Sequence, residues 1–370
     1  MIALRGVSFS YSYADAVVLK RVNLDFEPGE FSLITGATGS GKTTLLKAIN
    51  RLIPNFSPGT FQGQVLINQI DVTHQKPQQL AELVGYVPQS PDESFVAQNV
   101  IDELAFGMEQ LGVTPNEMRQ RIDAIAARLG IAHLLSREIS TLSGGEKQRL
   151  AIASALVAGQ RVLLLDEPTS SLDSTGAAEV LALLKELSTV HAITVLITEH
   201  RLERVLPLVD SMVTVHTDGS VEKNAGQIPK ATLTPQTETS VEPAVLIAEI
   251  KNLAIEFDGE TVFRNLNLKV SSGSITALTG PNGSGKSSCL WAIQGSGVRS
   301  AGSVLVNGQD PANLKSKERL ALVAKVPQRA TDLLFLNTVS AELFESDQAS
   351  GAAAGSTAKI LEGLVGRIDP

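Results

Sequence analysis

Two glycine-rich segments of the same pattern occur in this chain, GATGSGKT at 36–43 and GPNGSGKS at 280–287. Each follows an apolar stretch that predicts a buried strand and precedes a stretch that predicts a helix. Glycines at this spacing let backbone N–H groups turn towards phosphate oxygens, and the N-terminus of the following helix favours negative charge. The pair therefore predicts two phosphate-binding loops, each in an α/β domain built as strand, loop and helix.

The sequence around the loops repeats as well, since GQVLINQIDV at 63–72 matches GSVLVNGQDP at 302–311. We therefore predict two homologous domains in tandem, 1–220 and 244–370. The segment between them, 221–243, is rich in Thr, Pro, Glu and Gln and predicts an extended linker.

The composition is that of an ordinary globular protein and disfavours general binding to nucleic acid. Hydrophobic residues make up 43% of the chain, and the formal net charge of −8 opposes contact with a phosphate backbone. The single cysteine, Cys289, excludes an intrachain disulfide and favours a reducing compartment. The chain has no apolar run of about 18 residues and no signal-peptide pattern at its start. We therefore predict a cytosolic protein that would serve a membrane only by docking to a protein embedded there.

The two loops define candidate nucleotide-binding residues. Lys42 is predicted to reach the β- and γ-phosphates and Thr43 to hold Mg²⁺, and Lys286 and Ser287 take the same positions in the second loop. The alternative is a plain glycine turn, and two matches in equivalent contexts argue against it. The predicted loop residues are Gly36, Ala37, Thr38, Gly39, Ser40, Gly41, Lys42, Thr43 and Thr44, and Gly280, Pro281, Asn282, Gly283, Ser284, Gly285, Lys286, Ser287 and Ser288.

A pair of acids ends another predicted strand, in RVLLLDEPTSSLD at 161–173. Two adjacent carboxylates at a strand end are unfavourable unless a cation or a shared proton offsets their charge. We therefore predict that Asp166 binds Mg²⁺ and that Glu167 acts on the attacking water as a base or orienting group. The alternative is a solvated strand end without a function.

The segment TLSGGEKQRLAIASAL at 141–156 predicts a helix with a glycine-rich start. Ser143 and Glu146 have the S-x-x-E spacing of a capping box. The same helix start, with Gly144 and Gly145 exposed, is also suited to bind an anion. The two interpretations are compatible.

Three segments together resemble the ATP-binding cassette (ABC) ATPases. They are LSGGEKQR at 142–149, LLLDEPTSSLD at 163–173 and VLITEH at 195–200. The resemblance covers residues 1–220 in full and 245–345 in the front half. It implies a P-loop NTPase fold of the ABC type, with a mixed sheet and flanking helices, an antiparallel β subdomain and a helical subdomain, in tandem. It also implies ATP and Mg²⁺ as cofactors and ATP hydrolysis. Glu146 stands where glutamine is commoner in the family.

The resemblance implies further roles around the nucleotide. Tyr11 would stack on adenine, with Tyr13 as a substitute, and Phe257 takes the corresponding place in the second half. Gln89 would sense Mg²⁺ and the attacking water, and His200 would hydrogen-bond the γ-phosphate.

Cassettes of this family pair face to face, so that each ATP lies between one phosphate loop and the other cassette's SGG segment. The resemblance therefore implies contacts from Ser143, Gly144 and Gly145 with Glu146 beside them, and from Asp173. The implied Mg²⁺ ligands are Thr43, Gln89 and Asp166 in the first cassette and Ser287 and Gln328 in the second.

The segment QSPDESFVAQNVIDELAFGMEQLG at 89–112 is similar to the energy-coupling factor (ECF) transporter ATPases, which share an E-x-A-F-G helix start. The resemblance implies docking to a transmembrane scaffold subunit, and through it to a substrate-binding membrane subunit, for uptake of a vitamin, a vitamin precursor or a metal ion. Phe95, Val96 and Phe106 would form an apolar shelf for the partner. The alternative is that Phe95 and Phe106 fill the domain core.

The second half contains no counterpart of the LSGG, DEP or histidine segments. We therefore expect the second cassette to be truncated, or the chain to be a fragment, with hydrolysis requiring two copies to pair through their first domains. A soluble, non-transport ABC protein and a nucleotide-binding pseudoenzyme are the alternative functions. The Thr- and Pro-rich linker and the acidic composition favour a role in transport over a soluble, non-transport role.

Overall fold

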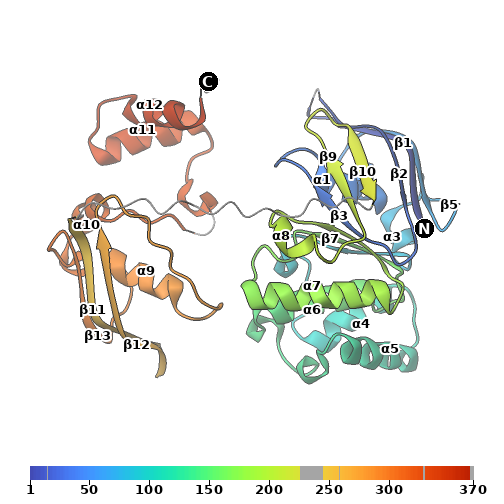
Figure 1. The fold of residues 1–370 in the computed structure, drawn as a ribbon, viewed down its shortest axis with the longest axis horizontal. Helices are drawn as coiled ribbons and strands as arrows, with labels where there is room; N and C mark the ends of the chain where they lie inside the picture. Colours follow the sequence, from blue (N-terminus) through green and yellow to red (C-terminus); the bar gives the residue numbers. More distant parts are fainter. Residues whose placement is uncertain (15, 226–244, 258, 328–329, 367–370) are drawn as a thin grey trace. The chain divides into compact units, whose positions relative to one another are not determined.

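The computed structural model describes residues 1–14, 16–225, 245–257, 259–327 and 330–366 (Figure 1). The chain divides into two compact units, Met1–Glu238 and Thr239–Pro370, and each is described by itself. Among the described residues, no helix combines the length and the apolar character needed to cross a bilayer.

The first unit is built on a six-stranded sheet with the order β10-β9-β3-β8-β7-β6. All neighbours pair in parallel except β10, which is antiparallel to β9 at one edge. Because parallel strands end at the same edge, the segments that follow β3, β7 and β8 meet there. The strands are β3 (Phe31–Thr35), β6 (Val84–Val87), β7 (Val162–Asp166), β8 (Thr194–Thr198), β9 (Ser211–Val215) and β10 (Val221–Ala225).

An antiparallel sheet of order β2-β1-β4-β5 forms a second layer of this unit. Its strands are β1 (Ile2–Tyr11), β2 (Val17–Phe26), β4 (Gly59–Ile67) and β5 (Ile70–Asp71). The helices of the unit are α1 (Lys42–Ile49), α2 (Leu52–Asn55), α3 (Pro77–Leu80), α4 (Val100–Gln110), α5 (Pro115–Arg128), α6 (Gly144–Leu156), α7 (Ser174–Thr189) and α8 (Leu202–Val205).

Alternate residues of the central strands fill two cores, one on each face of the six-stranded sheet. Leu163 and Leu165 of β7 pack into a cluster with α4, α5, α6 and α7. Leu164, between them, packs into a cluster with α1 and the antiparallel sheet. Figure 1 shows these helices on one side of the sheet and α1 with β1 and β2 on the other. The predicted fold, a mixed sheet with flanking helices, an antiparallel β subdomain and a helical subdomain, is confirmed for this unit.

Residues 221–225, which the composition assigned to the linker, form β10 instead. They pair with β9, and Lys223 Nζ lies 2.6 Å from Glu30 Oε1. The first unit therefore continues to Ala225 at least, because a short segment beside an open sheet edge gains backbone pairing that its composition does not reveal. The remainder of the predicted linker lies outside the described residues.

The second unit contains a three-stranded antiparallel sheet, β12-β11-β13. A small core lies between this sheet and the helix that follows the second loop, and it includes Cys289. The elements are β11 (Leu246–Phe257), β12 (Glu260–Ser271), β13 (Ala301–Val306), α9 (Lys286–Gln294), α10 (Ser316–Leu322), α11 (Val339–Ser350) and α12 (Ser356–Val365).

The buried strand predicted before the second loop is wrong in this structure. Residues 274–280 form no strand, and Ile275 is fully exposed, whereas Phe31 at the equivalent position of β3 is fully buried. In the first unit β3 lies between β8 and β9. The described part of the second unit has no counterpart of these two strands, so the apolar segment has no neighbours to pack against.

Candidate functional site

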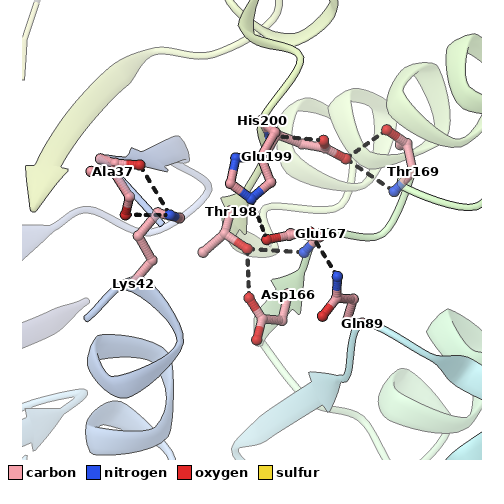
Figure 2. Close-up of polar contacts among 10 residues, drawn as sticks. Ala37, Lys42, Gln89, Asp166, Glu167, Thr169, Thr198, Glu199 and His200 are labelled. Atoms are coloured by element: carbon pink, nitrogen blue, oxygen red, sulfur yellow. Dashed lines mark hydrogen bonds and ion pairs between the residues drawn. The ribbon is translucent and has the colours of Figure 1, made fainter. Parts of the chain in front are cut away.

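The first glycine loop has the conformation of a phosphate cradle. Lys42, the first residue of α1, donates from Nζ to the carbonyl oxygens of Gly36 and Ala37, each at 3.0 Å (Figure 2). Gly36, Gly39 and Gly41 all have positive φ angles, which favour glycine. A Cβ atom on Gly36 would also lie 2.2 Å from the carbonyl oxygen of Val215, so a larger residue cannot occupy this position without a backbone shift.

A pocket of about 270 Å³ opens at this loop. The hydroxyl of Ser40 is buried without a hydrogen-bond partner in the described structure, which is the environment that an incoming phosphate oxygen would satisfy. The loop therefore fits a nucleotide phosphate. The lining residues are Tyr11, Val18, Thr38, Gly39, Gly41, Lys42, Thr43, Thr44, Glu167 and His200.

Two tyrosines form a stacked pair beside the pocket. The ring centroids of Tyr11 and Tyr13 are 5.1 Å apart with an interplanar angle of 24°. The hydroxyl of Tyr11 lies 3.0 Å from Thr44 Oγ1, so this ring is tied to α1, while Tyr13 is 78% exposed. Tyr11 lines the pocket and Tyr13 does not, which favours Tyr11 as the predicted adenine platform.

Three predicted catalytic side chains meet at the carboxyl edge of the sheet. Glu167, directly after β7, accepts a hydrogen bond on Oε2 from Gln89 Nε2 at 2.8 Å, and its Oε1 lies 2.7 Å from His200 Nε2 (Figure 2). Glu167 has a φ of +47°, which is unusual for a residue with a side chain. Its N–H donates to Thr198 Oγ1 at 2.9 Å, so β8 holds it in this conformation.

Asp166 lies at the end of β7 and is 6% exposed. Its Oδ1 accepts a hydrogen bond from the Thr198 hydroxyl at 2.7 Å. Burial, together with the negative charge of Asp166, raises the pKa of the neighbouring Tyr86 phenol. Asp166, Thr43 and Gln89 offer oxygen ligands, which Mg²⁺ prefers, so these residues fit the predicted ion.

Thr198 is a site residue that the sequence reading missed. One hydroxyl accepts from the Glu167 N–H and donates to Asp166, so it sets the positions of both acids relative to β8. Thr198 lies in the VLITEH segment at 195–200, in which only His200 was predicted to have a role.

The capping box at α6 is confirmed. The N–H and hydroxyl of Ser143 donate to Glu146 Oε2 at 2.8 and 2.7 Å, and the Glu146 N–H lies 3.4 Å from the Ser143 hydroxyl. The N–H and hydroxyl of Ser143, together with nearby Arg137, hold the pKa of Glu146 below its ordinary value of 4.5. Neither Ser143 nor the adjacent Gly144 and Gly145 line the pocket at Lys42.

Asp173, predicted to contact a second cassette, also does not line that pocket. It caps α7, since its Oδ1 accepts from the Gly176 N–H at 2.8 Å. A structural role in helix capping is therefore present, and contact with another cassette stays a prediction.

The lowered pKa of Glu146 leads to a pH-dependent stability prediction. A carboxyl whose folded pKa lies below its unfolded value contributes stability above the unfolded pKa and loses it as pH falls through the folded pKa. We expect Glu146→Gln to lower the stability of the first unit by about 0.5 kcal/mol at pH 7, since solvent screens the lost charge and glutamine keeps one hydrogen-bond acceptor, and by less at pH 3. Thermal unfolding followed by circular dichroism at both pH values measures this. An equal difference at the two values would contradict it, and Glu186→Gln on the exposed face of α7 is the control.

The second loop repeats the conformation of the first. Lys286 Nζ donates to the carbonyl oxygens of Gly280 and Pro281 at 2.9 and 2.6 Å. Gly280, Gly283 and Gly285 have positive φ angles like their counterparts. The two loops therefore share one geometry. Among the described residues, an acidic pair like Asp166 and Glu167 lies at the end of a strand in the first unit and has no counterpart in the second.

A wider pocket of about 830 Å³ lies at the second loop. Ser287 and Ser288 line it, as do Trp291 and Lys325, whose Nζ lies 4.8 Å from the indole ring centroid. Phe257, the predicted adenine platform, does not line this pocket. Gln328, predicted as a Mg²⁺ ligand, lies outside the described residues.

The predicted docking shelf is divided in the structure. Phe95 packs partly against the core of the helical layer, while Val96 is 63% and Phe106 43% exposed. The core interpretation is therefore correct for Phe95, and the shelf stays a prediction for Val96 and Phe106. Glu103 is buried and accepts on Oε2 from the N–H groups of Val96 and Ala97 at 2.9 and 3.0 Å.

The same arrangement recurs in the second unit, where Glu342 accepts from the N–H groups of Phe335 and Leu336. The glutamate of the E-x-A-F-G pattern therefore holds the preceding segment against the start of α4, and it fixes how Val96 and Phe106 are displayed.

The family model described as ABC transporter matches residues 19–170 and 263–364. A curated protein of Streptomyces coelicolor that is named an ABC transporter ATP-binding protein is 35% identical over 434 residues, covering 99% of this chain and 77% of that protein.

Solved structures give the same result. The structure of cbiO1 from Clostridium perfringens, described as part of the ABC transporter complex cbiONQ, is 30% identical with a TM-score of 0.55, covering 60% of this chain and 88% of that chain. The ATP-binding cassette MJ0796, solved as a dimer bound to ADP and Pi, is 27% identical with a TM-score of 0.52, covering 61% of this chain and 99% of that chain.

Proposed function

Because the chain belongs to the ABC transporter family of ATP-binding proteins, we propose that it is the ATPase subunit of a membrane importer of the energy-coupling factor type. An ABC cassette binds and hydrolyses ATP. The finer assignment rests on the exposed pair Val96 and Phe106, held in place by Glu103 in an E-x-A-F-G helix start. Likeness to cbiO1, which is part of a transporter complex, supports it.

In the proposed site, the loop N–H groups, the Lys42 ammonium and the N-terminus of α1 bind the triphosphate. Tyr11 stacks on the adenine. Thr43, Gln89 and Asp166 hold Mg²⁺, which neutralises phosphate charge when it is bound. The pocket lining supports the roles of Tyr11, Lys42 and Thr43, and the burial of Asp166 at the end of β7 supports its role as a cation ligand.

Hydrolysis requires a water to be oriented and deprotonated beside the γ-phosphate. Glu167 is the candidate for this task, because its carboxylate is held between Gln89 and His200 at the pocket. Gln89 orients the carboxylate, and His200 contacts the γ-phosphate and so connects the nucleotide to Glu167.

We further propose that the chain works at the cytoplasmic face of the membrane as a peripheral subunit. A transmembrane scaffold subunit contacts Val96 and Phe106. The scaffold in turn binds a second membrane subunit, which holds the transported substrate. The transported substrate is a vitamin, a vitamin precursor or a metal ion. The scaffold transmits the movement of the paired cassettes to the substrate-binding subunit.

Replacing Phe106 by Ala tests the docking surface. A buried aromatic anchor contributes about 2 kcal/mol or more to an interface, so we expect at least about tenfold less polytopic membrane protein to co-purify with the tagged chain from detergent-solubilised membranes of its host. Quantitative mass spectrometry measures the amount. Val190→Ala, at a 68% exposed residue following α7, is the control. Equal recovery with Phe106→Ala and wild type would contradict docking here, and recovery of ribosomal proteins alone would contradict the importer assignment.

A further inference from the structure

A buried carboxylate without an assigned role lies directly behind the candidate catalytic residues. Glu199 stands between Thr198 and His200 and is 4% exposed. Among the described residues no Lys, Arg or His side chain lies within ion-pairing distance of it. A buried carboxylate in this situation is tolerated only if hydrogen bonds satisfy it.

Those hydrogen bonds come from two different segments. Glu199 Oε1 accepts from the N–H and the hydroxyl of Thr169, at 3.0 and 2.6 Å, and Oε2 accepts from the His200 N–H at 3.3 Å (Figure 2). Thr169 is itself 2% exposed. The carboxylate therefore joins the segment after β7 to the segment after β8 inside the protein, away from solvent screening.

The segment that Glu199 holds is the turn that follows Glu167. The N–H of Ser170 donates to the Glu167 carbonyl at 3.1 Å, and that of Leu172 donates to the Thr169 carbonyl at 3.2 Å. The turn ends at Asp173, which caps α7. Thr169 is the point at which this turn is attached to the residue preceding His200.

We propose that Glu199 is a positioning residue that fixes the turn 167–173 and His200 in one arrangement. A movement of Asp173 that displaces the turn then changes the distance between His200 Nε2 and Glu167 Oε1. Conversely, a movement of His200 displaces the turn and Asp173. This rests on the proposed roles of Glu167, His200 and Asp173. Glu199 itself lines no part of the pocket, so it acts on turnover through its neighbours.

The experiment compares steady-state ATP turnover and ATP affinity of the full chain, at saturating protein concentration, for Glu199→Gln and Thr169→Val. Glutamine keeps the size of the side chain, but its NH₂ group must then face an N–H or hydroxyl donor. A misplacement of reacting groups by about 1 Å lowers turnover by up to about 100-fold. We expect kcat to fall at least about tenfold in both variants, with the ATP dissociation constant within about threefold of wild type, because Lys42 and its loop are untouched.

Thr169→Ser, which keeps the hydroxyl, should retain turnover, and the double variant Glu199→Gln with Thr169→Val should lose little more than either single variant. Glu203→Gln, at an exposed acid of α8, is the matched control.

Parallel losses of ATP affinity, melting temperature and kcat would make Glu199 merely structural and overturn the proposal. Unchanged kcat in Glu199→Gln, while Glu167→Gln loses turnover, would overturn the proposal alone. Unchanged kcat in Glu167→Gln would overturn the proposed function together with it. If Glu199→Gln does not fold, Thr169→Val against Thr169→Ser decides by the same criteria.

Discussion

Replacing Glu167 by Gln should lower ATP turnover by at least about 100-fold while ATP binding persists. The carboxylate accepts from Gln89 on one oxygen and lies 2.7 Å from His200 Nε2 on the other. An amide of the same size cannot take up a proton from water, and its NH₂ group must face one of these two partners. The phosphate loop, which supplies the affinity for ATP, is left intact.

Single-turnover hydrolysis and equilibrium binding of labelled ATP separate the two effects. Glu186→Gln, an exposed change on α7, is the control for charge and size. Turnover within about threefold of wild type would remove Glu167 from the catalytic role. Loss of ATP binding in step with turnover would instead make its contacts with Gln89 and His200 structural.

The phosphate loops were predictable because their geometry is local. The acceptors of Lys42 lie five and six residues before it, and the turn depends on glycines whose φ angles few other residues adopt. The same reasoning holds for Ser143 and Glu146, which are three residues apart. Sequence spacing alone carries such information.

The contacts of Thr198 and Glu199 were not predictable in this way. Their partners, Glu167 and Thr169, lie 31 and 30 residues away and come within reach only because β7 and β8 pair in parallel. A threonine and a glutamate at a strand end have many ordinary explanations. Only the register of the sheet shows that they hold the turn after Glu167.

Burial depends on neighbours more than on the segment itself. Phe31 and Ile275 occupy equivalent positions in repeated segments, yet one is fully buried and the other fully exposed. Phe95 and Phe106 were likewise predicted to form one docking shelf, but the first packs against the core and the second faces solvent. The surrounding strands and helices therefore decide which side chains are covered and, at residues 274–280, whether an apolar segment forms a strand at all.

A mixture of two inactive variants should recover activity if two first units pair. In one unit, Lys42 lies at the pocket and Ser143 does not, so a complete site of the kind implied by paired cassettes needs the loop of one copy and the α6 start of another. Lys42→Ala removes the phosphate-binding ammonium, and Ser143→Arg blocks the α6 start. Each variant alone leaves every composite site with one defect, and we expect at least about 100-fold lower turnover for each.

In a mixed pair, one composite site carries both defects and the other carries none. With random pairing in equal amounts, turnover should therefore return to about a quarter of the wild-type value. The wild-type rate per molecule should also rise with protein concentration until pairing is complete. A mixture of Lys42→Ala with the wild-type chain is the control, because it measures how far an inactive copy lowers the turnover of the pairs that it joins. No recovery in the mixture, together with a concentration-independent wild-type rate, would show that one unit completes its site without a second copy, and the separation of Ser143 from the Lys42 pocket would then have no catalytic consequence.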